Sequence, residues 1–155
     1  MNGKMMVAIE EVLIKEAPDW LLIYGDTNST LAAELVAAKL HISICHVEAG
    51  ARTYSMTNSE EINRICTDHV SKLLLASTRS EYDEMTREGL QDRGLLVGDS
   101  MYDAFIEYSN RLNLSEIELS LLKRGTTKVP DEYYYLTCHR EENTNDDKDL
   151  FEIFK

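Results

Sequence analysis

The sequence lacks a hydrophobic run of the length that crosses a bilayer, about 20 apolar residues, because polar residues interrupt all of its apolar segments. Residues 1–6 contain no extended apolar stretch of the kind found in signal peptides. We therefore expect a cytoplasmic protein with no membrane partner.

Cysteine and basic residues are also scarce. The three cysteines, Cys45, Cys66 and Cys138, form no CxxC pair and are odd in number, which indicates reduced thiols. No His or Cys residues stand at the short spacing of a zinc site. With 28 acidic and 16 basic residues, the net charge of −12 disfavours nucleic acid as a partner. Local donors can still bind a nucleotide.

Short apolar segments alternate with helix-like segments along the 155 residues, of which 43% are hydrophobic. This alternation predicts an α/β fold with a mostly parallel sheet. Residues 115–123 are compatible with a further helix, and residues 125–130 have the composition of a linker. We expect strands at 21–24, 42–47, 73–76, 95–97 and 133–138, and helices at 4–16, 31–40, 59–71 with Ser59 as N-cap, 80–88, 101–112 and 146–154.

Two acidic residues lie just past the ends of predicted strands. Asp26 follows the strand at 21–24, and Glu48 follows the strand at 42–47. Parallel strands joined by a helix end at the same edge of the sheet, where open α/β sheets bind ligands. We therefore expect both carboxylates to face one crevice, and paired acids in a crevice suggest proton chemistry.

The turns after these strands allow two interpretations each. Residues 25–30 offer backbone and hydroxyl donors to an anion, but helix capping by Asp26 and Asn28 is the better explanation of this segment taken alone. In the second turn, Arg52 can hold a phosphate or pair with Glu48. The alternative is a surface ion pair beside a half-buried His46, and the residues alone leave both open.

Two further groups have an ordinary surface explanation. Glu60 and Arg64 stand four apart on a predicted helix and can pair on a solvated face. His139 follows the strand predicted at 133–138, where it can act as a general acid, bind a diphosphate or face solvent in a capped turn.

Taken together and in order, five segments resemble the UDP-N-acetylglucosamine 2-epimerase family over nearly the whole chain. Each segment alone is weak evidence, whereas the ordered set is highly specific. The segments are PDWLLIYGDTNSTLAAEL, HISICHVEAGART, SEEINRICTDHVSKLLLAST, LLVGDSMYDA and YYYLTCHREENT.

The resemblance implies a glycosyltransferase-B-like fold, in which two Rossmann-like domains enclose the active site. It implies interconversion of UDP-N-acetylglucosamine and UDP-N-acetylmannosamine by elimination of UDP to a 2-acetamidoglucal and its re-addition, with no metal or redox cofactor. It places the acid/base groups on Asp26, Glu48 and Glu60 and the cleft histidine on His139. The residues it assigns to substrate contacts are Thr27, Arg52, Arg140 and Glu142. Of the two arginines, Arg140 is the one better suited to a structural role.

The chain departs from the family pattern at two positions and in its extent. Ser59 replaces a frequent Pro, and Ala51 replaces a usual Leu. By the resemblance, residues 1–112 belong to the later part of the N-terminal domain, 113–130 to the interdomain crossing and 131–155 to the start of the C-terminal domain. We expect this chain alone to have little activity and to self-associate as a homo-oligomer through exposed sheet edges.

Three alternatives stay open besides the epimerase with its UDP-sugar substrate. One is a hydrolysing relative that releases N-acetylmannosamine. Another is a non-catalytic remnant that binds sugar nucleotides or self-associates. The third, a glycosyltransferase of the same fold, is disfavoured by the HVEAG and HREEN segments.

Overall fold

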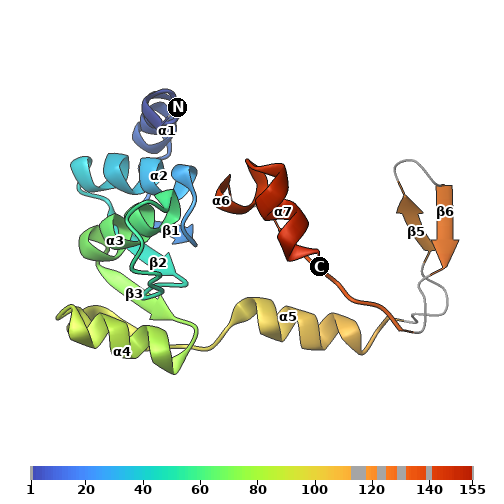
Figure 1. Ribbon diagram of the computed structural model, residues 1–155. Coiled ribbons are helices and arrows are strands. Elements are labelled where there is room, and N and C mark those ends of the chain that lie inside the picture. Colours follow the sequence, from blue (N-terminus) through green and yellow to red (C-terminus); the bar gives the residue numbers. More distant parts are fainter. Residues whose placement is uncertain (1, 113–117, 122–124, 129–131, 139–140, 155) are drawn as a thin grey trace. The chain divides into compact units, whose positions relative to one another are not determined.

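The computed structural model divides the chain into two compact units, Met1–Asn110 and Arg111–Lys155 (Figure 1). We describe each unit by itself. The assignment of the second unit to an interdomain crossing and a second domain stays a prediction. The structure describes residues 2–112, 118–121, 125–128, 132–138 and 141–154.

A four-stranded parallel sheet with strand order β1-β2-β3-β4 is the framework of the first unit. The α/β fold with a parallel sheet is therefore confirmed. In the register, Trp20 pairs with Ser43 and Tyr24 with Val47, so β1 and β2 end level with each other. The strands are β1 (Trp20–Tyr24), β2 (Ser43–Val47), β3 (Leu73–Ala76) and β4 (Gly94–Leu96), close to the four predicted segments.

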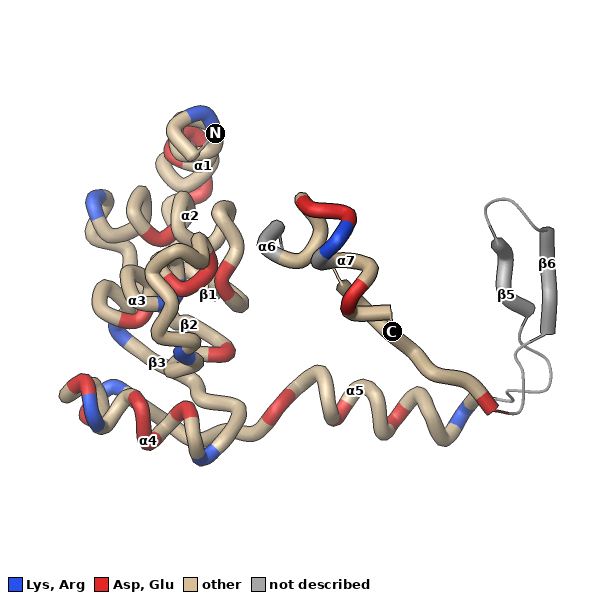
Figure 2. Tube along the Cα trace, viewed as in Figure 1, with Lys and Arg blue, Asp and Glu red and all other residues tan. Residues whose placement is uncertain are grey.

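Helices connect and flank these strands. In α4 (Arg79–Arg87), the acidic positions lie in the middle of the helix and the basic positions at its two ends (Figure 2). Within the described parts of the chain, no helix combines the length and the apolarity that crossing a membrane requires. The helices of the first unit are α1 (Asn2–Glu16), α2 (Asn28–Lys39), α3 (Ser59–Val70), α4 (Arg79–Arg87), the short 3₁₀ helix η1 (Gln91–Arg93) and α5 (Ser100–Ser109).

Polar side chains cap α2, α3, α4 and α5. Thr27 caps α2, and Thr78 forms a reciprocal capping box with Glu81 at the start of α4. The N-cap predicted at Ser59 is wrong by one residue. Asn58 has the extended backbone of a cap, and its side chain accepts a hydrogen bond from the backbone N–H of Glu60 at 3.0 Å.

Buried apolar side chains form two clusters that hold the helices on the sheet. The first joins α1 and α2 to β1 and β2, and the second joins β3 to α4 and the segment after it. Burial of apolar surface, at about 25 cal/mol per Å², therefore fixes the strands whose ends carry the polar turns. The clusters are Leu13, Ile23, Val36, Ala37 and Ile44, and Ala49, Leu74, Ala76, Met85 and Leu90.

The second unit differs from the sequence-based prediction in three places. Residues 118–121, expected in a helix, form strand β5 (Glu118–Leu121), and residues 125–128, expected in a linker, form strand β6 (Gly125–Lys128). The two strands pair antiparallel. The sequence ELSL alternates polar and apolar residues with the period of a strand, and this period outweighed the helical signal.

The strand predicted at 133–138 is also absent, since these residues form neither helix nor strand. They are rich in tyrosine, which favours strands, but a strand needs a hydrogen-bonded neighbour, and Tyr133, Tyr134 and Tyr135 are exposed. The final helix is confirmed as α7 (Asp147–Ile153), with Asp146 as its N-cap, and it follows the short α6 (Glu141–Thr144).

A carboxyl group lies fully buried between α2 and α3. Glu34 has 0% of its surface exposed, and its Oε2 accepts a hydrogen bond from the hydroxyl of Thr67 at 3.0 Å. Its Oε1 makes no hydrogen bond with any residue that the structure describes. Burial raises the pKa of Glu34 to about 7, because a charged carboxylate loses its hydration there.

This raised pKa predicts a pH-dependent stability for the variant Glu34→Gln. The folded state favours the protonated carboxyl, so the contribution of Glu34 to stability is complete below its unfolded pKa and is lost as pH rises through about 7. Glutamine keeps an acceptor for Thr67 and does not ionise. Between pH 4.5 and 8, the stability of the variant relative to the wild type should rise by up to about 3 kcal/mol.

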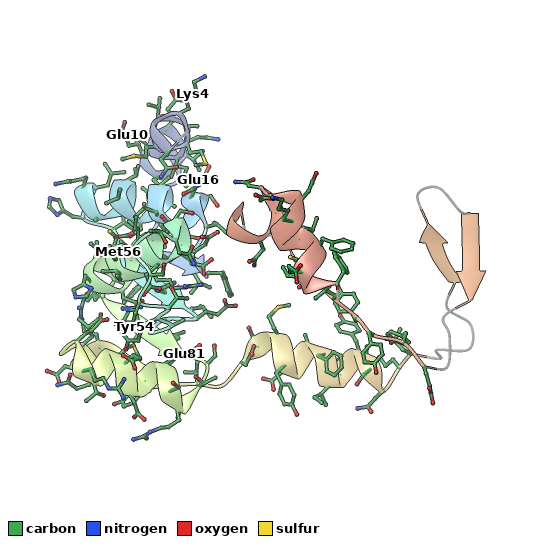
Figure 3. All side chains as sticks on the ribbon, in the orientation of Figure 1. Lys4, Glu10, Glu16, Tyr54, Met56 and Glu81 are labelled. Carbon is green, nitrogen blue, oxygen red and sulfur yellow. The ribbon has the colours of Figure 1, made fainter. Side chains whose placement is uncertain are left out.

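Urea denaturation of both proteins across this pH range measures the difference. Glu10→Gln is the matched control, because Glu10 is an exposed residue on α1 (Figure 3). A relative stability of Glu34→Gln that stays constant with pH would contradict the expectation.

Candidate functional site

A pocket of about 300 Å³ lies at the carboxyl ends of the parallel strands in the first unit. Its walls come from the turns after β1, β2 and β3 and from the starts of α4 and α5. Asp26 and Glu48 both line it, so the structure brings these two predicted site residues together. The wall also contains Arg64, Glu81 and Asp99, which leaves the pocket predominantly acidic.

The carboxylate of Asp26 is held by a cation from the neighbouring helix. It forms a short ion pair with Arg64 of α3, whose guanidinium also contacts Oε2 of Glu61 at 3.2 Å. The side-chain amide of Asn63 donates to the backbone carbonyl of Asp26 at 2.7 Å. Helix α3 thus fixes both the backbone and the side chain of Asp26, while the cap of α2 is Thr27 rather than Asp26 or Asn28.

Glu48 lies beside the turn that carries Asp26. The backbone N–H of Gly25 donates to the carbonyl of Val47 at 3.1 Å. A side-chain carbon added at Gly25 would lie 3.5 Å from Oε2 of Glu48. Glu48 itself has a positive φ of 68°, an uncommon conformation that is frequent at functional sites. The left-handed backbone and the close glycine together direct this carboxylate toward the Asp26 turn.

Glu60 is not brought into this pocket. It lies in the first turn of α3 with an exposed side chain, and its Oε2 accepts a hydrogen bond from the hydroxyl of Ser59 at 3.1 Å. It is not among the residues that line the pocket around Asp26. The convergence of three carboxylates on one pocket is therefore observed for Asp26 and Glu48, and the role of Glu60 stays a prediction.

Of the two adjacent glutamates Glu60 and Glu61, Glu61 is the one that holds the loop at Thr53 and Tyr54 in place. Its carboxylate accepts hydrogen bonds from the backbone N–H groups of Thr53 and Tyr54, both at 2.8 Å. Burial by itself raises the pKa of Glu61, but these bonds and Arg64 outweigh burial and lower it. Sequence reasoning missed this role, because nothing in the EEIN segment distinguishes the buried glutamate from the exposed one.

Arg52, predicted to contact the substrate, is occupied by two carboxylates. Its side chain is 2% exposed, and Nη1 lies 2.7 Å from Oδ2 of Asp68. Nε and Nη2 donate to the two carboxylate oxygens of Glu88 at 2.7 and 2.8 Å. This two-pronged pairing favours a structural role for Arg52 over direct contact with a ligand.

His46 and Asp68 form a buried polar pair beneath the pocket, where the sequence suggested a half-buried histidine. Nδ1 of His46 lies 2.7 Å from Oδ1 of Asp68, and Nε2 lies 2.8 Å from the carbonyl oxygen of Gly25. The backbone N–H of Gly50 donates to Oδ2 of Asp68 at 3.0 Å. Burial by itself raises the pKa of Asp68, but His46 and Arg52 outweigh it and lower the pKa.

The remaining predicted site residues are placed as follows. Thr27 is exposed and acts as the N-cap of α2, with its hydroxyl accepting from the backbone N–H of Thr30 at 3.3 Å. Glu142 lies in α6 of the second unit. His139 and Arg140 lie outside the described residues.

Within the described part of the chain, neither a disulfide nor a cluster of metal ligands forms part of the site. The three cysteines are free, in line with the expectation of reduced thiols. Among the described residues, no three His, Cys, Asp or Glu side chains gather in a way that could hold a metal ion.

The chain belongs to the UDP-N-acetylglucosamine 2-epimerase family, whose model matches residues 1–155. It is 43% identical, over 94% of its length, to UDP-2,3-diacetamido-2,3-dideoxy-D-glucuronate 2-epimerase of Pseudomonas aeruginosa and covers 40% of that protein. It is 40% identical, over 98% of its length, to UDP-N-acetylglucosamine 2-epimerase of Methanocaldococcus jannaschii and covers 41% of it. The chain thus spans about 40% of the length of these relatives.

Solved structures of the family have the same fold. The crystal structure of the Methanocaldococcus jannaschii enzyme in complex with UDP-GlcNAc and UDP matches 99% of this chain with a TM-score of 0.83 and 37% identity, over 41% of that enzyme. The Neisseria meningitidis enzyme bound to UDP-GlcNAc matches 72% of this chain and 31% of its own, with a TM-score of 0.69 and 31% identity. The first unit is therefore part of a glycosyltransferase-B-like fold, as the resemblance implied.

Substitution of Gly50, in the turn after Glu48, should lower the free energy of unfolding much more than substitution of Gly89. Gly50 has a φ of +89°, and an added side-chain carbon would lie 2.3 Å from the backbone oxygen of Glu81. Gly89 also has a positive φ, but its surroundings are open. Gly89→Ala should cost about 1 kcal/mol of unfolding free energy for the backbone conformation alone, whereas Gly50→Ala should cost at least about 2 kcal/mol more, as expected for an overpacked site.

Chemical denaturation of the two variants measures this difference. Gly89→Ala serves as the control for backbone strain without steric overlap. Equal losses of stability in the two variants would show that the turn after Glu48 is not tightly packed against α4.

Proposed function

We propose that this chain carries the acid/base part of a UDP-N-acetylglucosamine 2-epimerase active site, with Asp26 and Glu48 as catalytic groups. The observation that carries the proposal is the single pocket lined by both carboxylates, in a chain that belongs to this family. The reaction interconverts UDP-GlcNAc and UDP-ManNAc through elimination of UDP and its re-addition to a 2-acetamidoglucal.

The charge of the pocket suits the sugar rather than the diphosphate. The proton on C2 is barely acidic, so elimination depends on early cleavage of the C1–O bond and on positive charge developing in the sugar ring. Fixed carboxylates stabilise such charge, and one of them can exchange the C2 proton. Asp26, held by Arg64, suits electrostatic stabilisation, and Glu48 suits proton transfer.

The departing UDP needs cationic hydrogen-bond donors, whereas the residues that line this pocket are mostly acidic. Arg52 is engaged with Asp68 and Glu88, so it is a poor candidate for binding the diphosphate. We assign that task to His139, which the resemblance places near the diphosphate. We keep Glu60 as a candidate acid/base group, and Thr27, Arg140 and Glu142 as candidates for substrate contacts. Catalysis by positioning requires all walls of the site, so the isolated chain should have little turnover.

A second candidate substrate comes from the 43% identical Pseudomonas aeruginosa relative, which is named for UDP-2,3-diacetamido-2,3-dideoxy-D-glucuronate. Epimerisation at C2 of that sugar also moves a proton at C2, a task for which the same two carboxylates are suited. Analysis of the products separates both epimerases from a hydrolysing relative, which releases the free sugar. Binding of UDP without any turnover would favour a binding remnant.

A chimera tests the proposal. Residues 1–110 replace the matching segment of the Methanocaldococcus jannaschii enzyme, and NMR in D₂O follows both the formation of UDP-ManNAc and the exchange of the C2 proton. Asp26→Asn and Glu48→Gln should each lower the rate by 10² to 10⁴-fold, the usual contribution of a general acid or base. Asp92→Asn, an exposed residue in η1, should leave the rate unchanged.

Two results would overturn the assignment. One is an active chimera in which both carboxylate variants keep their rates. The other is ordinary turnover by the isolated 155-residue chain, which would contradict the need for further walls.

We also propose that the chain forms homo-oligomers through β1, a strand at the exposed edge of the sheet. A cytoplasmic location stays a prediction. Strand β1 lies at one end of the strand order. Its residues Trp20, Leu22 and Tyr24 alternate along the strand on one face and are 47%, 50% and 57% exposed. An apolar strip on an edge strand favours association.

Light scattering at high and low protein concentration tests this association. The mass of the wild type should exceed that of a monomer, and Leu22→Lys should lower it. Val70→Lys, at an exposed apolar position of α3, is the matched control. A monomer at every concentration would refute the proposal.

A further inference from the structure

We propose that His46 is a positioning residue that uses two ring N–H groups to tie the Asp26 turn and the Glu48 turn to each other. The consequence for catalysis rests on the proposed function, whereas the tie itself is a property of the fold. No part of the epimerisation chemistry passes through the ring, because its side chain is fully buried.

The partners of the ring define its hydrogen-bonding state. Nε2 lies 2.8 Å from the carbonyl oxygen of Gly25, and a carbonyl oxygen can only accept. Nδ1 lies 2.7 Å from Oδ1 of Asp68. Both contacts are hydrogen bonds only if both ring nitrogens carry a proton, since a neutral imidazole has a single N–H.

Asp68 is held as an acceptor by its other neighbours. Arg52 lies 2.7 Å from its Oδ2, and the backbone N–H of Gly50 donates to the same oxygen at 3.0 Å. Two donors on Oδ2 leave Oδ1 to His46. On the α2 side, a second buried carboxyl, that of Glu34, lies near the ring. The charge of His46 acts to lower the pKa of Glu34, against the larger effect of burial. A cationic ring therefore faces buried carboxyl groups on α2 and α3.

The two hydrogen bonds of the ring, one of them through Asp68, hold the backbone next to the two proposed catalytic carboxylates. Through Nε2, the ring holds the carbonyl of Gly25, the residue directly before Asp26. Through Nδ1 and Asp68, it holds the N–H of Gly50, two residues after Glu48. His46 itself stands two residues before Glu48. Loss of one N–H would release one of the turns and change the separation of the carboxylates.

The protonation of the ring is directly measurable in the wild-type chain. NMR of the protein labelled with ¹⁵N-histidine at pH 7 should give two directly bonded N–H protons on His46, both protected from exchange. His41→Asn assigns the spectrum and serves as a control, because His41 is exposed and asparagine tolerates its φ of +60°. A ring with a single N–H overturns the proposal whatever the activity.

Kinetics of the chimera provide the second measurement. His46→Gln keeps one donor and one acceptor, and kcat should fall at least 10-fold while KM changes less than twofold, because the carboxylates shift but the substrate contacts stay. His41→Asn should change neither constant. An unchanged kcat in a folded His46→Gln chimera refutes the positioning role.

The two outcomes separate this inference from the proposed function. If Asp26→Asn and Glu48→Gln leave the chimera active, the catalytic assignment fails, but two N–H protons on His46 still establish the tie. If those variants are inactive and His46 carries one proton, the function stands and the tie is wrong.

Discussion

The buried carboxylate of Asp68 joins α3 to β2 and to the turn that follows β2. It contacts the ring of His46 from β2, the guanidinium of Arg52 and the backbone N–H of Gly50. A carboxylate without water is costly unless such donors surround it. Removing one donor would leave charge unpaired in the interior, so the turns after β1 and β2 depend on the complete set.

The pocket beside this network is acidic partly because the network engages a nearby cation. Arg52 is paired with Asp68 and Glu88, which removes a cation from the site and leaves the carboxylates of Asp26 and Glu48 dominant. Arg64, which lines the pocket, pairs with both Asp26 and Glu61. A pocket of this charge suits a sugar that becomes positive in the transition state, and the chain belongs to the UDP-N-acetylglucosamine 2-epimerase family.

Much of the fold was predictable because periodic patterns decide it locally. Four short apolar segments separated by helical stretches became β1 to β4, and their order along the sheet followed their order in the chain. The pattern failed in the second unit. The tyrosine-rich segment 133–138 has strand propensity but no neighbouring strand, whereas 118–121 found its partner at 125–128. Strand formation depends on a partner that propensity does not reveal.

The sequence by itself determined that Asp26 and Glu48 meet, because parallel strands joined by helices must end at one edge. Only the tertiary structure decided between chemically equivalent neighbours. Glu61 became the buried clamp and Glu60 the exposed residue, and Arg52 became a structural cation. These outcomes depend on which donors lie within about 3 Å of each carboxylate. The backbone N–H groups that hold Glu61 belong to Thr53 and Tyr54, which the fold of the preceding loop brings to it.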